Sequence, residues 1–214
     1  MIPGSTEALI ARLAENAPSV KPLPSPGRRA LLTLAVVAAA GLLAIFLSNP
    51  RGHLGGTDEG IRLEMMAVLA TGLLGVAGAF FAAVPGRSRL WLAAPLPFFG
   101  AWLLMSGASC YADLAAGGSE RMAMGSSWHC LLFITATSLG LALPVTWLLS
   151  RAAPIEAGRV AVLAGLGVAT LSTFLLYFFH PFEVTAGDIA VHMGTIALVT
   201  GTIALLRRQA FGRV

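Results

Sequence analysis

Residues 160–179 read VAVLAGLGVATLSTFLLYFF, a run of twenty residues that contains no charged side chain. A helix needs about 20 apolar residues to cross the roughly 30 Å hydrocarbon core of a bilayer. Five further apolar stretches lie at 31–48, 63–84, 90–109, 128–149 and 187–206. Proline- and glycine-containing segments, which end helices, separate all six. The pattern predicts an all-α polytopic membrane protein with six transmembrane helices in residues 31–214, preceded by a tail over residues 1–30.

The composition agrees with this fold class. Only 11% of the 214 residues are charged and 57% are hydrophobic, whereas a soluble domain carries about 25% charged residues. The net charge of +4 raises the question of nucleic-acid binding. The basic residues flank apolar runs and do not gather on one face, so we expect a lipid bilayer as partner and no direct nucleic acid.

Positive charge is distributed unequally between alternate loops. One side receives Arg12, Lys21, Arg28, Arg29, Arg87, Arg89, Arg151, Arg159, Arg207, Arg208 and Arg213. The other side receives only Arg51, Arg62 and Arg121. Because basic residues stay on the cytoplasmic side of a membrane, both chain termini are predicted to be cytoplasmic.

The tail has two parts. Ser5 is placed to cap a short helix in which Ile10, Leu13, Ala14 and Ala17 form an apolar stripe. An extended, polyproline-like segment then runs from Val20 to Pro26. Two interpretations stay open: an interfacial helix lying on the lipid headgroups with Arg28 and Arg29 as topology anchors, or a helix that binds a protein partner.

The two cysteines, Cys110 and Cys130, lie at the outer ends of the third and fourth spans, joined by a 19-residue loop. A disulfide between them would persist only if that face is oxidising, and two buried, structural cysteines are the alternative. No Cys-x-x-Cys motif supports a thioredoxin-like enzyme.

All four histidines, His53, His129, His180 and His192, fall on or near the outer face. Together with the thiols, His129, His180 and His192 are candidate ligands for a soft metal, although none has ligand spacing. A hydrogen bond from His192 to Asp188, four residues earlier on the same helix face, is the simpler expectation.

Small residues mark faces along which helices can approach closely. These residues are Gly72, Gly75 and Gly78 in the second span, Ala161, Gly165 and Ala169 in the fifth, and Ala197 and Gly201 in the sixth. Packing within the bundle is the first expectation, and self-association into a homo-oligomer is the second.

No P-loop, nucleophile elbow or His-Glu-x-x-His motif occurs in the sequence. The absence of paired intramembrane carboxylates disfavours an ion-coupled transporter. We therefore expect no enzymatic activity and no cofactor. A membrane thiol oxidoreductase is the alternative, and a small metal transporter subunit is a weaker one.

Several elements, in a consistent order, resemble the NrsF family of bacterial inner-membrane anti-sigma factors. The stretch VKPLPSPGR at 20–28 is similar to the family's PVxxLPxPxxR element, and Gly107–Asp113 resembles its GxxCxxD/W element. Cys130 takes the place of the second family cysteine. Arg151–Pro154, the Phe179–Pro181 corner and His192 complete the series. Val191 departs from the pattern, since family members often carry tryptophan before this histidine.

The resemblance implies an inner-membrane protein that regulates transcription by holding an extracytoplasmic-function sigma factor inactive. Cys110 and Cys130 would sense heavy-metal or oxidative stress on the outer face. The tail would bind the sigma factor, and the implied contact residues are Ile10, Leu13, Val20, Leu23, Pro24, Pro26 and Arg28.

Overall fold

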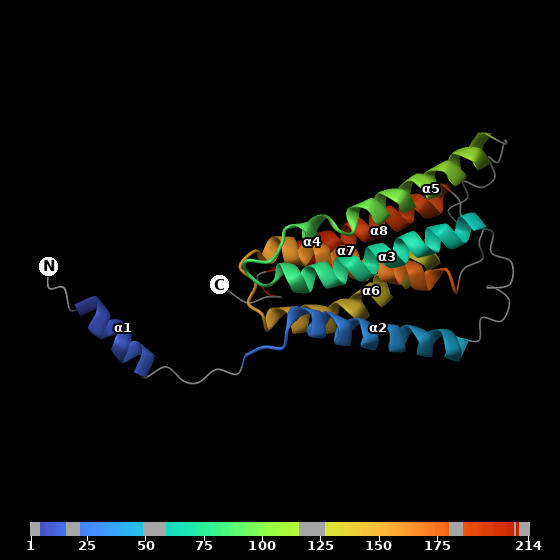
Figure 1. The fold of residues 1–214 in the computed structure, drawn as a ribbon. Coiled ribbons are helices and arrows are strands. Elements are labelled where there is room, and N and C mark those ends of the chain that lie inside the picture. The colour runs from blue at the N-terminus through green and yellow to red at the C-terminus, as the bar shows by residue number, and fades with distance from the viewer. Residues whose placement is uncertain are drawn as a thin grey trace.

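The computed structural model describes residues 5–15, 22–48, 59–115, 127–179, 186–207 and 209. Every regular element in these ranges is a helix. In chain order they are α1 (Ser5–Glu15), α2 (Pro26–Ser48), α3 (Glu59–Ala82), α4 (Leu90–Ala93), α5 (Leu96–Ala115), α6 (Ser127–Ser150), α7 (Ala157–Leu176) and α8 (Ala186–Leu205). Helices α2 to α8 form an elongated bundle, and α1 lies apart from it (Figure 1). The all-α prediction is confirmed for the described residues.

Five of the described helical segments are long and apolar enough to cross a membrane: Pro26–Leu47, Glu59–Ala82, Leu90–Ala108, Leu131–Ser150 and Ala157–Leu176. A shorter apolar segment, Ile189–Leu205, lies within α8. These segments correspond to the six apolar stretches of the sequence.

The centre of the bundle is an antiparallel pair, α3 and α7, in which glycine residues allow the two helices to approach closely. A Cβ atom on Gly75 would lie 2.8 Å from the Cα of Gly167, and one on Gly167 would lie 2.6 Å from the backbone nitrogen of Val76. One turn further along, Gly72 faces Leu171. The two backbones therefore touch, which is how membrane helices associate closely without a hydrophobic driving force between them.

The other helices surround this pair. Helix α8 packs against α7, where Gly165 meets the backbone of Thr200, and α6 packs against both α7 and α8. The small residues of α3 and α7 therefore line helix contacts as the sequence indicated. For α8 the first expectation, packing within the bundle, was wrong: Ala197 is exposed, and a Cβ on Gly201 would meet nothing within 4 Å. The opposite face of α8, which carries Ile196, Val199 and Ile203, is buried instead.

Two helix boundaries differ from the sequence prediction for a chemical reason. Helix α2 begins at Pro26, not residue 31, because Ser25 caps it: the Arg28 amide donates to Ser25 Oγ at 3.4 Å and the Arg29 amide to the Ser25 carbonyl at 3.1 Å. Proline at the first helical position loses no hydrogen bond. The third span is interrupted between α4 and α5, because Pro95 has no N–H to continue the hydrogen-bond ladder.

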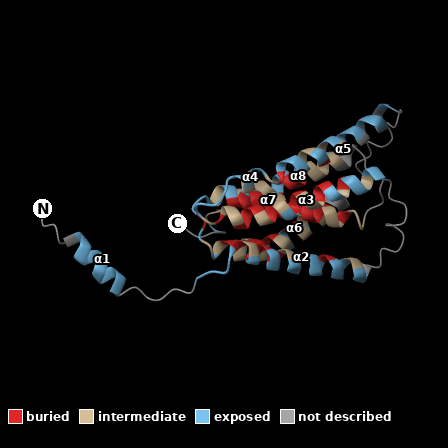
Figure 2. Ribbon diagram, viewed as in Figure 1, coloured by how far each residue is buried: buried red, intermediate tan, exposed pale blue. Residues whose placement is uncertain are grey.

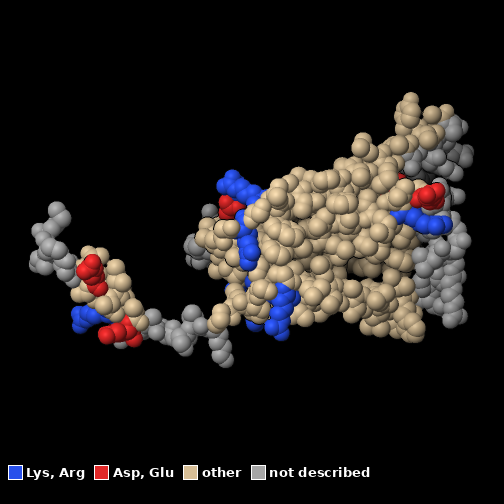
Figure 3. All heavy atoms as spheres, in the orientation of Figure 1, with Lys and Arg blue, Asp and Glu red and all other residues tan. Residues whose placement is uncertain are grey.

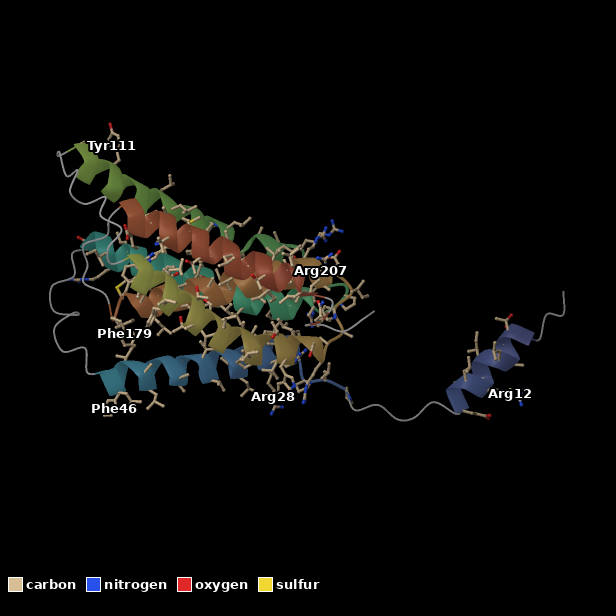
Figure 4. All side chains as sticks on the ribbon, turned by 180° about the vertical axis from the view of Figure 1, so that it is seen from behind. Arg12, Arg28, Phe46, Tyr111, Phe179 and Arg207 are labelled. Atoms are coloured by element: carbon tan, nitrogen blue, oxygen red, sulfur yellow. The ribbon has the colours of Figure 1, made fainter. Side chains whose placement is uncertain are left out.

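The arginines of the bundle are concentrated at one end. Figure 3 shows most of the basic side chains there, at the end from which the tail leaves. This arginine-rich end consists of Arg28, Arg29, Arg87, Arg89, Arg151, Arg159 and Arg207. Figure 4 shows Arg28 and Arg207 at this end and Phe46, Tyr111 and Phe179 at the other. Because successive spans run in opposite directions, alternate loops of the sequence meet at the same end.

Candidate regulatory site

The tail helix α1 presents its apolar residues to the surroundings. Leu9, Ile10 and Leu13 are 56%, 60% and 64% exposed. Glu7 lies in the first turn and Arg12 in the last, which favours the helix through its dipole. An 11-residue helix with an uncovered apolar stripe is marginal in isolation. Its stability therefore depends on a surface against which the stripe can be buried.

The segment between α1 and the bundle is extended where it is described. Leu23 and Pro24 are exposed, and Pro26 is buried at the start of α2. Val20 lies outside the described residues. Among the tail residues implied by the family resemblance, Ile10, Leu13, Leu23, Pro24 and Arg28 are accessible to a partner, whereas Pro26 is committed to the bundle.

At the base of the tail, Arg28 and Arg29 have opposite environments. Arg28 is exposed, whereas Arg29 is only 7% exposed. The Arg29 guanidinium donates from Nη2 to the Leu148 carbonyl near the end of α6, and it lies over the Phe80 ring of α3 at 5.2 Å from the centroid. Nearby, the Arg151 guanidinium stacks on Trp147 at 4.0 Å. The sequence identified Arg29 only as a topology anchor and gave no indication of these contacts.

The cysteines lie at the opposite end of the bundle from these arginines. Cys110 belongs to the last turns of α5, and Cys130 is the fourth residue of α6. Neither thiol side chain is among the described ones, so their pairing stays a prediction. The two helices have different principal neighbours, since α5 packs against α3, and α6 against α7 and α8.

The histidine predictions receive little structural information. His53 and His180 lie outside the described residues, and the side chains of His129 and Asp188 are not described. His192 lies in α8 and is partly buried. No group of three His, Cys, Asp or Glu residues that would hold a metal ion occurs within the described part of the chain. The metal-ligand candidates stay predictions.

A buried polar cluster at the cysteine end was not predicted. Tyr177, just after α7, donates its hydroxyl to Glu64 Oε2 at 3.3 Å and accepts a long hydrogen bond from the Trp102 indole at 3.4 Å. Glu64 is 6% exposed and Trp102 is 1% exposed. A buried carboxylate needs such partners because it has left water. The cluster therefore ties α3, α5 and the end of α7 together. An acidic residue inside an apolar span, Glu64, is the sequence signal that could have indicated it.

The arginine-rich end is hollowed between two loops. A cavity of about 350 Å³ is lined by Pro85, Arg87, Arg89, Ile155 and Glu156, among others. Glu156 already pairs with Arg159, at 2.6 Å between Oε2 and Nη1. The loops that form this cavity join α3 to α4 and α6 to α7.

The fold and these sites define a helical bundle suited to a membrane, with a protruding arm at its arginine-rich end. The family "negative regulator of sigma F" (NrsF) matches residues 13–211, nearly the whole chain. The protein is therefore a member of the NrsF family, as the ordered sequence elements indicated. Neither a curated protein nor a solved structure matches the chain. Family membership assigns the chain a role in negative regulation of a sigma factor.

Proposed function

We propose that this protein is an inner-membrane anti-sigma factor that holds an extracytoplasmic-function sigma factor on its cytoplasmic tail. The observation that carries the proposal is the exposed apolar stripe of α1. The chain that carries this helix belongs to a family of negative regulators of a sigma factor. A regulator of transcription that is confined to a membrane must reach its target from the cytoplasmic side. The tail is the described part of the chain that extends furthest from the bundle (Figure 1).

The proposed topology has six spans with both termini in the cytoplasm. Segregation of arginine to one end supports it, since basic residues resist translocation. Helix α8 is the proposed sixth span, and its antiparallel packing against α7, with Gly158 near Arg207 and Gly165 near Thr200, supports this assignment. This topology puts α1 in the cytoplasm and Cys110 and Cys130 at the outer face.

In the proposed function, Cys110 and Cys130 sense the stimulus. The protein is proposed to act as a binding protein and not as an enzyme. Oxidation or metal binding at Cys110 and Cys130 would favour one arrangement of α5 and α6 over another. A ligand or modification shifts an equilibrium only by its differential stabilisation of the two states. Moving the tail from mostly bound to mostly free requires about 5 kcal/mol of such difference. A disulfide would favour an arrangement in which the Cα atoms of Cys110 and Cys130 lie within about 7 Å of each other.

A pull-down from native membranes tests the proposed partner. Full-length tagged protein is compared with a variant lacking residues 1–28, and the captured proteins are identified by mass spectrometry. Recovery of a sigma factor that depends on the tail is the expected result. The absence of any sigma factor with the intact tail, under mild detergent, would contradict the proposal.

Two point variants sharpen the test because α1 offers a matched control. Ile10→Asp introduces a charge on the apolar stripe, whereas Ala8→Asp introduces the same charge on the opposite face of α1. Burial of an isoleucine side chain contributes about 1.5–3 kcal/mol, so Ile10→Asp should weaken sigma-factor binding at least about tenfold. Ala8→Asp should bind as the parent does. Equal binding by both variants would show that the stripe is not the contact surface.

A further inference from the structure

Two adjacent arginines at the base of the tail carry the same charge but occupy different surroundings. A residue that serves only as a topology anchor needs positive charge at the membrane surface, and exposed Arg28 meets this need. Arg29 has left water almost completely, at 7% exposed. Burying a guanidinium is unfavourable unless its donors are satisfied, so its contacts indicate a more specific role.

The contacts of Arg29 join three helices. Its backbone belongs to the first turn of α2, its Nη2 donates to the Leu148 carbonyl of α6, and its planar group lies over Phe80 of α3. Leu148 is among the last residues of α6, whose carbonyls have no helical partner of their own. A hydrogen bond from a charged donor is stronger than one between neutral groups. The bond therefore fastens the base of the tail to the end of α6.

Helix α6 extends from this bond to the opposite end of the bundle, where Cys130 lies in its first turn. Pro144 lies inside the helix between these two points. Because proline lacks an N–H, the helical bond to the Gly140 carbonyl is missing, and the helix is weakened there. A change at the outer end of α6 therefore has a direct structural route to Leu148, and from Leu148 to the tail.

We infer that Arg29 is a positioning residue that couples the position of α6 to the base of the tail. The inference rests on the proposed function, in which Cys130 receives the stimulus and the tail holds the sigma factor. In the resting arrangement, Arg29 holds the start of α2 against Leu148 and Phe80. Displacement of the α6 end breaks or moves this bond, and the first turn of α2 with the attached tail changes position.

A double-mutant cycle tests the coupling without any partner or stimulus. Pro144→Ala restores the missing N–H and changes the course of α6, and Arg29→Lys keeps the charge but removes the planar, multi-donor group. Hydrogen exchange is measured on the full chain in lipid nanodiscs at the amides of Gly27, Arg28 and Arg29. Two of these amides bond to Ser25 and report on the order of the tail base.

The expected result is an interaction between the two sites. Pro144→Ala should change exchange at the tail base about tenfold in the parent, the scale of a hydrogen bond to a charged group. In the Arg29→Lys background, Pro144→Ala should change the exchange rate by less than about twofold. A change of that size is within the error of additivity and counts as no effect. Arg28→Lys, the matched control, should preserve the full effect of Pro144→Ala.

Two results would overturn the inference. If Pro144→Ala has no effect in the parent, α6 does not reach the tail base. If its effect is equal with and without Arg29, the route runs elsewhere. If the Arg29→Lys variant does not fold, Phe80→Leu takes the place of Arg29→Lys in the cycle. Leucine at position 80 removes only the aromatic ring that the guanidinium contacts. Failure of the sigma-factor pull-down with coupling intact would remove the proposed partner and leave the positioning role of Arg29 in place.

Discussion

The central pair and the surrounding helices of this bundle are packed very differently. In α7, 72% of the apolar window is buried and in α3 50%, compared with 22% in α2, 17% in the α4–α5 span and 22% in α6. Figure 2 shows the same contrast: buried residues concentrate on α3 and α7, and α2 and α5 are mostly exposed. Backbone contact through Gly75 and Gly167 occurs in the first region. The helices of the second region contact the centre along part of their surface, and the rest is not covered by the described part of the chain.

The comparison indicates which helices can move. A closely packed pair whose backbones touch has little freedom to rearrange, whereas helices held along one face can shift with small losses of contact. The three functional features of the proposal all belong to the loosely packed region: Cys110 in α5, Cys130 in α6 and the tail on α2. The central pair then serves as the fixed support against which the outer helices are displaced.

The largest effect is expected where the central backbones touch. Gly167→Val should prevent the α3–α7 contact, because even a Cβ at this position lies 2.6 Å from a backbone nitrogen. Overpacking costs about 1–3 kcal/mol, and more where backbone must move, so the folded bundle should be lost. Gly107→Val, in α5 with nothing within 4 Å, is the control and should fold normally. The free energies of unfolding of the two variants are compared by steric trapping in bicelles. Equal values would contradict the difference in packing between the central pair and the surrounding helices.

A pair of phenylalanines tests the same contrast with one side chain. Phe80 in α3 is fully buried, whereas Phe46 in α2 is 81% exposed. Phe80→Ala should lower the free energy of unfolding by up to about 3–5 kcal/mol through the cavity it leaves. Phe46→Ala should change it little, because that exposed ring has few protein contacts to lose. A similar loss for both variants, in the same unfolding assay, would mean that α2 is covered by protein along its outer half.

The polar cluster provides the third test. Tyr177→Phe keeps the ring in the bundle but removes the hydroxyl that bonds to Glu64 and Trp102. Loss of a partner to a buried polar group costs about 1–3 kcal/mol, so the midpoint of thermal unfolding in detergent should fall. Tyr111→Phe is a suitable control, since Tyr111 is 75% exposed on α5. An unchanged midpoint for Tyr177→Phe would show that the cluster does not hold α3 and α7 together.

The smallest effect on stability is expected at the cysteines. The double variant Cys110→Ser, Cys130→Ser should unfold like the reduced parent and bind sigma factor equally well at rest. Only release should change: oxidant or cadmium should free the sigma factor from the parent and not from the variant. Release is measured by the sigma factor that remains on immobilised nanodiscs. Loss of resting binding in the variant would instead favour a structural role for the thiols.

The sequence predicted the helical class and the approximate extent of each apolar segment because length and hydrophobicity decide whether a helix can cross a membrane. It missed the start of α2 and the break at Pro95, although Ser25–Pro26 and Pro95 themselves carry the information. Among the faces of small residues, those on α3 and α7 were correctly identified, and the one on α8 was not. A row of small residues permits close approach, but it does not determine which neighbour occupies the face.

The sequence by itself determined that this chain is a bundle of apolar helices, which loops carry arginine, and which family it belongs to, because these properties follow from local composition and ordered motifs. Only the tertiary structure decided that Arg29 and Leu148, 119 residues apart, form one bond, and that Glu64 meets Tyr177 across the bundle. Such pairs depend on how far each helix is rotated and shifted against its neighbours. That arrangement results from the packing of the whole bundle, and no single segment contains it.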